Sequence, residues 1–261
     1  MDYKPPHPLD VVITPDILAK YQRVFAFLLR LMRVKQAMQA VSRMTRKDTQ
    51  RLFPTFTQAN RQLLHFRFVA QAFITAVEQY TFDTCIGGNF DAFLSRLVPA
   101  DSHSQSTSEA RNTPIGLPSV FALADAHNDT LDAILSALLL RSSQRAGGDL
   151  LRGALEIVLE FANMVESRRS GAQEEYAAKD ELQNLYVRFA GKVGALTKVL
   201  KGYVDKNLGT SNGYLHADGA LLVNTRPLRG AHSLNDLLIR LDLGTWWIDQ
   251  IPRRSASRGA S

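Results

Sequence analysis

The chain has 261 residues, of which 45% are hydrophobic and 21% are charged, and it contains a single cysteine, Cys85. This composition is typical of a folded protein with a sizeable core, and one cysteine excludes a disulfide framework or a cysteine-based metal cluster. No apolar run approaches the roughly 18 residues of a membrane span, and residues 1–8 lack the features of a secretory signal, so we expect a cytosolic protein.

Positive charge is concentrated at the front of the chain. The formal net charge is +6, and residues 1–70 hold twelve Lys or Arg against four Asp or Glu, whereas the remainder holds 19 basic and 21 acidic residues. Such a surplus indicates a surface for an acidic partner or for nucleic acid. It is also consistent with the solvated polar face of an amphipathic helix, and both interpretations stay open.

The first long helix is predicted to begin at Thr14-Pro15-Asp16 and to end near Asp48. Thr14 can cap the free N–H groups, Pro15 suits the first helical position, and Asp16 favours the positive end of the helix dipole. Apolar side chains then follow at three- and four-residue spacing and predict one broad buried stripe. Its members are Ile17, Tyr21, Val24, Phe25, Leu28, Leu31, Met32, Met38 and Val41.

A second helix is predicted from about residue 57 to residue 85. Leu63, Leu64, Phe66, Phe68, Val69, Phe73, Val77, Tyr80 and Phe82 are expected to form its apolar face. Gly87-Gly88-Asn89 predicts a break before a short helix over residues 90–97. Residues 99–118 are rich in Ser and Pro and are expected to form a flexible surface insertion.

Helices are also predicted over about residues 119–141, 150–167, 174–207 and 234–241, with Gly147-Gly148-Asp149 separating the first two. The predicted fold is therefore all-α, an elongated bundle of long antiparallel helices. Residues 1–250 are expected to form one domain, followed by a disordered basic tail over residues 251–261.

No group of residues supports catalysis. Residues 209–213 match the G-x-S-x-G pattern around a nucleophilic serine, Ser211, but that turn needs a preceding strand, and a helix is predicted there instead. Cys85 and His127 fall on apolar helix faces and are expected to be core residues. The histidines show no zinc-binding spacing, so we expect no metal and no cofactor.

Four segments, taken in order, resemble the C-terminal domain of gamma-tubulin complex components, also called spindle pole body components. Residues 3–14 with the Tyr21 to Leu29 stretch resemble its Pro-Leu, short apolar run and Tyr-x-x-x-Phe-x-x-Leu helix. Residues 73–80 resemble its Phe-Val helix ending in Gln-x-Tyr, and residues 126–131 its Ala-His segment. Residues 234–242 (Leu-Asn-Asp-Leu-Leu-Ile-Arg-Leu-Asp) resemble its closing motif.

The resemblance implies a helical, non-enzymatic scaffold. In this family the C-terminal half binds gamma-tubulin, and assembly with other components gives a ring that templates microtubule nucleation at spindle poles and centrosomes. Any GTP belongs to gamma-tubulin. Full members are longer, so the chain resembles the C-terminal half of one. The implied location is the cytoplasm and the microtubule-organising centre, with no membrane and no nucleic acid as partner.

Residues for gamma-tubulin contact are predicted from the basic front segment, because tubulins are acidic. They are Arg43, Arg46, Lys47, Arg61 and Arg67, with further contacts expected from residues 208–231. The alternatives are a basic helical module that binds nucleic acid and, more remotely, a serine hydrolase that uses Ser211.

Overall fold

The structure is a computed structural model, and it describes residues 5–7, 9–46, 53, 57–97, 119–169, 175–211 and 229–242. Only the backbone is described for residues 168–169, 175–178, 206–211, 229–232 and 242. The expected insertion at 99–118 and the expected tail at 251–261 both lie outside the described residues. Neither expectation is tested.

The described chain is helical throughout its regular elements and contains no strand, which confirms the predicted all-α class. The elements in chain order are η1 (Leu9–Val11), α1 (Pro15–Arg46), α2 (Gln58–Gln79), η2 (Tyr80–Gly87), α3 (Gly88–Leu97), α4 (Val120–Ala137), η3 (Ser142–Gln144), α5 (Arg145–Arg169), α6 (Glu175–Ser211) and α7 (Arg229–Asp242). No described helix is both long and apolar enough to cross a membrane.

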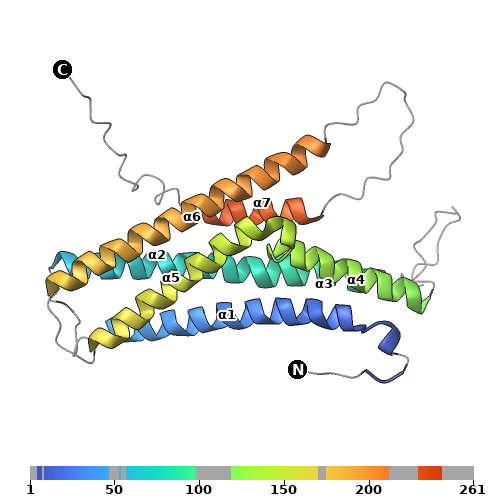
Figure 1. Cartoon of the computed structure of the whole chain (residues 1–261), viewed down its shortest axis with the longest axis horizontal. Helices are drawn as coiled ribbons and strands as arrows, with labels where there is room; N and C mark the ends of the chain where they lie inside the picture. Colours follow the sequence, from blue (N-terminus) through green and yellow to red (C-terminus); the bar gives the residue numbers. More distant parts are fainter. Residues whose placement is uncertain are drawn as a thin grey trace, which may run out of the picture.

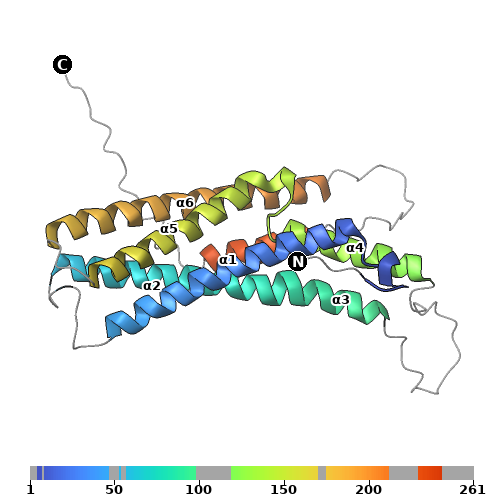
Figure 2. The same ribbon diagram turned by 60° about the horizontal axis from the view of Figure 1, so that its bottom comes forward.

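The long helices lie side by side along one axis of an elongated molecule (Figures 1 and 2). Helices α1 and α2 run in opposite directions, because Lys35 of α1 pairs with Glu78 of α2, whereas Thr45, further along α1, meets the earlier Arg67. Gln62 of α2 contacts Gln183 of α6, and three residues further along both helices His65 contacts Tyr186. Helices α2 and α6 therefore run in the same direction. The bundle is therefore mixed rather than wholly antiparallel.

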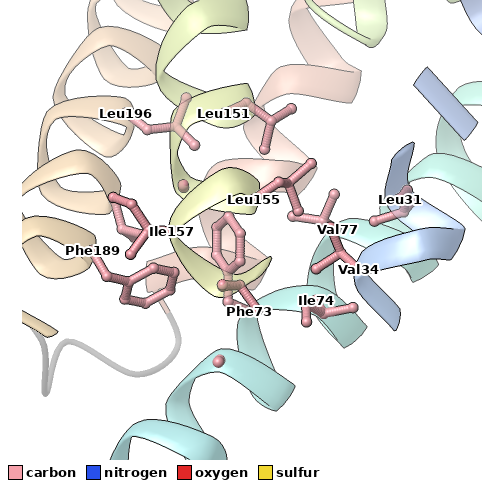
Figure 3. Close-up of a cluster of buried hydrophobic side chains, with 14 of the residues drawn as sticks. Leu31, Val34, Phe73, Ile74, Val77, Leu151, Leu155, Ile157, Phe189 and Leu196 are labelled. Atoms are coloured by element: carbon pink, nitrogen blue, oxygen red, sulfur yellow. The ribbon is translucent and has the colours of Figure 1, made fainter. Parts of the chain in front are cut away.

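One hydrophobic core joins α1, α2, α4, α5, α6 and α7. Figure 3 shows its centre, where side chains from four of these helices converge. They are Leu31 and Val34 of α1, Phe73, Ile74 and Val77 of α2, Leu151, Leu155 and Ile157 of α5, and Phe189 and Leu196 of α6. The rings of Phe73 and Phe189 meet edge to face with their centroids 5.4 Å apart, an arrangement that aromatic pairs prefer.

Helix α1 begins as predicted, with the backbone N–H of Ile17 donating to Thr14 Oγ1 at 3.4 Å. Its buried stripe differs from the predicted one. Phe27 and Val34 are buried, whereas Tyr21 and Phe25 are exposed, Phe25 by 47%. The difference arises because the wider predicted stripe covers more than the one side of α1 that packs on the bundle.

The predicted break at Gly87-Gly88-Asn89 is wrong. Helix α2 continues through η2, a stretch of π-helix, directly into α3. The buried amide of Asn89 donates to the carbonyl of Cys85 at 2.7 Å, which satisfies a backbone group inside the helix. Glycine lowers helix stability by only about 1 kcal/mol, so packing of the surrounding turns can outweigh it.

The predicted separator at Gly147-Gly148-Asp149 is also wrong, because both glycines lie in the first turns of α5. The preceding turn brings the backbone of Leu139, which has a positive φ of 57°, against this helix. A Cβ atom on Gly148 would lie 2.5 Å from the Leu139 carbonyl oxygen. Glycine is therefore present here for close backbone approach and not to end a helix.

Candidate partner-binding surface

The outer face of α2 is the side of that helix turned away from the core. We define it by Arg61, Leu64, Phe68, Gln71, Ala72, Thr75 and Gln79. At 100° per residue these seven residues fall on one side of α2, opposite the buried Phe66, Val69 and Phe73. Phe68 is 66% exposed and Leu64 is exposed too, so apolar and basic side chains share this surface.

The last turns of α1 border this face. Arg43 and Arg46 are exposed and, together with Gln39 and Ser42 of α1 and Gln71 of α2, they line a hollow of about 490 Å³. Their position near the carboxyl end of α1 is favourable for positive charge because the helix dipole is negative there. Two of the five predicted contact residues are thus brought to one rim, beside the outer face of α2.

The other predicted contact residues have different fates. Arg61 is exposed on the outer face of α2. Arg67 is half-buried, and its guanidinium donates to Thr45 Oγ1 at 2.5 Å, so it holds α2 against α1. Lys47 lies outside the described residues, as does most of the predicted contact segment at 208–231.

Charge pairing distinguishes this rim from the two lysines of α1. Lys20 is 2.6 Å from the carboxylate of Asp132, and Lys35 pairs with Glu78. Within the described part of the chain, no carboxylate lies within ion-pairing distance of Arg43 or Arg46; Arg43 Nε donates at 3.4 Å to the Gln39 carbonyl. The rim therefore presents positive charge that the described fold leaves unneutralised.

Titratable groups in the interior have structural surroundings. Burial raises the pKa of the Cys85 thiol to about 12 and raises the pKa of Tyr80 well above its usual value. The Tyr80 hydroxyl donates to the Ala137 carbonyl at 2.7 Å. A thiol with such a pKa is not a nucleophile near neutral pH, and the prediction of a core cysteine is confirmed.

Ser211 is the last residue of α6, so a long helix and not a strand precedes it. The strained strand-to-helix turn that exposes a hydrolase serine is therefore missing at this position. Among the residues that the structure describes, no three His, Cys, Asp or Glu side chains are grouped so as to hold a metal ion.

Phe68 and Leu64 were predicted to be part of the apolar face of the second helix, and that prediction is wrong for these two residues. Helical spacing alone could have shown it, because both fall on the opposite side from Phe66 and Phe73. An apolar residue on the polar side of an amphipathic helix is the signal that was available in the sequence.

The segments that carry the family resemblance contact one another in pairs. The Tyr21 hydroxyl lies 2.8 Å from Nε2 of His127, which joins the first segment to the third. Arg240 of the last segment donates to the side chain of Gln79 in the second at 3.4 Å, and it pairs with Asp236 at 2.9 Å. The resemblance is therefore carried by residues that join α1 to α4 and α2 to α7.

Comparison with known proteins agrees with this arrangement. No curated protein matches the chain. The profile of the family described as gamma tubulin complex component C-terminal matches residues 1–247, which is nearly the whole chain. The chain belongs to the gamma-tubulin complex component family and comprises its C-terminal domain.

Proposed function

We propose that this chain binds gamma-tubulin and holds it in position to template microtubule nucleation. The observation that carries the proposal is the family match over residues 1–247. The basic rim of Arg43 and Arg46 supports it, because an acidic partner would find unneutralised positive charge there. Arg61 adds an exposed positive charge on the outer face of α2, and Lys47 follows Arg46 directly in the sequence.

The physical role is preorganisation. Bringing several tubulin subunits together costs translational and rotational entropy, and a scaffold that holds gamma-tubulin at fixed spacing meets that cost before nucleation starts. Such a chain makes and breaks no covalent bond, so we propose a non-enzymatic scaffold without a cofactor of its own. It would act with other components of the complex at a microtubule-organising centre, a spindle pole body or centrosome.

The test is charge reversal at two places along one helix. Arg43→Glu with Arg46→Glu reverses the rim, and Lys47→Glu can be added as a third change. Arg30→Glu with Arg33→Glu is the matched control, because these exposed residues lie at least ten positions before Arg43 on α1 and line neither of the hollows beside α2. Purified gamma-tubulin is then pulled down with each variant at several salt concentrations, after thermal unfolding has confirmed that each variant is folded.

The expected result is a loss of about tenfold or more in affinity for the rim variant at low salt, shrinking as salt screens the charges. The control is expected to bind as the unaltered chain does. Equal binding by both variants at every salt concentration would contradict a contribution from the rim.

A nucleic-acid-binding module is the second candidate, and the basic surplus in residues 1–70 favours it. It predicts binding to a DNA or RNA duplex that falls steeply with salt and no stable complex with gamma-tubulin. Binding to a nucleic-acid duplex and binding to gamma-tubulin can both be measured with the same purified chain. The two candidate functions predict opposite outcomes in these two measurements.

A further inference from the structure

The outer face of α2 is the floor of a groove between α1 and α7. At one end lies the basic hollow lined by Arg43 and Arg46, and next to it a second hollow of about 490 Å³ is lined by Phe68, Ala72, Thr75, Ala76 and Arg240, among others. Gln71 lines both hollows, so they adjoin on the same helix. In the view of Figure 2, α1 crosses over α2.

The two walls of the groove, formed by α1 and by α7, differ in chemistry. At the α7 wall, Arg240 is neutralised by Asp236 at 2.9 Å, and the floor beside it consists of small side chains and the exposed ring of Phe68. At the α1 wall, Arg43 and Arg46 have no carboxylate partner among the described residues. An occupant that complements both walls carries negative charge on the side facing α1 and apolar side chains on the side facing α7 and Phe68.

We propose that this groove holds one amphipathic helix of gamma-tubulin, with a carboxylate facing Arg43 and Arg46 and an apolar side chain against Phe68. The inference rests on the proposed function and adds the mode of recognition to it. Binding of an amphipathic helix in a groove between helices is a common way to combine apolar anchoring with charge-based orientation.

The dimensions of the groove fit a helix. Its floor runs from Phe68 to Gln79, a rise of about 16 Å along α2, which equals about three turns of a helical occupant. Ala72 and Ala76 leave room for a backbone to approach to the 8–10 Å spacing of packed helices. The described residues offer no strand edge to which an extended peptide could add.

Anchoring is tested with two exposed phenylalanines. Phe68→Ala removes the apolar contact in the groove, and Phe121→Ala on α4 is the matched control, because Phe121 is 72% exposed and lies outside the groove. With purified gamma-tubulin as the probe, we expect Phe68→Ala to weaken binding about tenfold or more and Phe121→Ala to change it less than about twofold. Ala72→Glu, which adds a negative charge to the floor, should weaken binding to a similar extent.

The helical form of the occupant is tested by placing a photoreactive amino acid at position 72 of the full chain. Crosslinks to gamma-tubulin should fall within one helix of that protein, at intervals of three or four residues. Crosslinks scattered over several segments, or none at all in a complex that forms, would overturn the helix-in-groove proposal.

The outcomes for the two proposals are distinct. If the unaltered chain binds gamma-tubulin and Phe68→Ala and Ala72→Glu bind equally well, the groove proposal is wrong and the proposed function stands. If the unaltered chain does not bind gamma-tubulin, the proposed function fails and the groove proposal fails with it. Loss of binding in both groove variants, with Phe121→Ala unaffected, supports both.

Discussion

Two regions of the molecule use the same residue types for opposite purposes. In the interior, Phe73 packs edge to face on Phe189, and the Tyr80 hydroxyl bonds to the Ala137 carbonyl. On the outer face of α2, only five residues before Phe73, the ring of Phe68 is two-thirds exposed and lies beside a basic rim. Phe73 and Tyr80 lie in a segment that resembles the gamma-tubulin complex components, whereas Phe68 lies outside it.

The comparison shows what a family resemblance of this kind reports. The segments that resemble the family contain two side-chain pairs that join helices to one another: Tyr21 with His127, and Arg240 with Gln79. Arg43, Arg46 and Phe68 belong to none of these segments, although they face outward. The same segments also supply Thr75, Ala76, Gln79 and Arg240 to the second hollow, so the resembling residues contribute both to packing and to part of the candidate surface.

The largest effect is expected from one change made in both regions of α2. Phe73→Ala should lower the free energy of unfolding by about 3–5 kcal/mol, because it opens a cavity in the core. Phe68→Ala should change it by less than about 0.5 kcal/mol, since the ring is mostly in water. Urea unfolding of both variants gives the comparison, and equal losses would show that Phe68 is part of the packing.

Glycine substitutions provide the next test. Gly148→Ala should cost about 1–3 kcal/mol, because the added Cβ meets the Leu139 carbonyl oxygen. Gly191→Ala in α6 has open space around the added atom and should stabilise the helix by up to about 1 kcal/mol. Thermal unfolding measures both; a neutral Gly148→Ala would mean that the turn between α4 and α5 can move aside.

Removing one buried hydroxyl should have a smaller effect. Tyr80→Phe leaves the Ala137 carbonyl without its side-chain donor and should lower stability by about 1–2 kcal/mol. Tyr186→Phe serves as the comparison, because Tyr186 is only half-buried where its hydroxyl meets His65 at 3.2 Å, and it should cost less than about 1 kcal/mol. A larger loss for Tyr186→Phe would contradict the importance assigned to the Tyr80 contact.

The smallest effect concerns pH. Burial lowers the pKa of His127 in the folded chain, whereas the unfolded chain has a histidine pKa near 6.5. Below that pH the unfolded chain binds more protons, so stability is fully present above pH 6.5 and falls as the pH is lowered, with a slope under about 1.4 kcal/mol per pH unit. Unfolding measured between pH 8 and pH 5 should show this slope, and His127→Gln should reduce it.

Much of the fold was predictable because apolar spacing follows the helix period. The capping residues Thr14, Thr57 and Ser119 each accept a backbone N–H at the start of a helix, and the first of these was predicted. The glycine pairs were misread because glycine serves two purposes: it ends helices, and it also lets two backbones approach closely. At Gly148 the second purpose is recognised only from the position of the Leu139 backbone, which the sequence does not show.

Less of the candidate surface was predictable. The sequence identifies Arg43, Arg46 and Arg61 as basic, and the structure places them around one face. It does not show that Arg67 is used internally on Thr45, because that contact depends on how α1 crosses α2. The second wall of the groove, α7, is more than 150 residues from Phe68 in the chain, so only the tertiary fold brings Arg240 beside it.

The central claim is that this domain binds gamma-tubulin directly. Sedimentation velocity of the purified chain with purified gamma-tubulin, mixed at micromolar concentration and physiological salt, tests it without any variant. The account predicts a single one-to-one complex that sediments faster than either protein alone. Two separate boundaries at every concentration would contradict it.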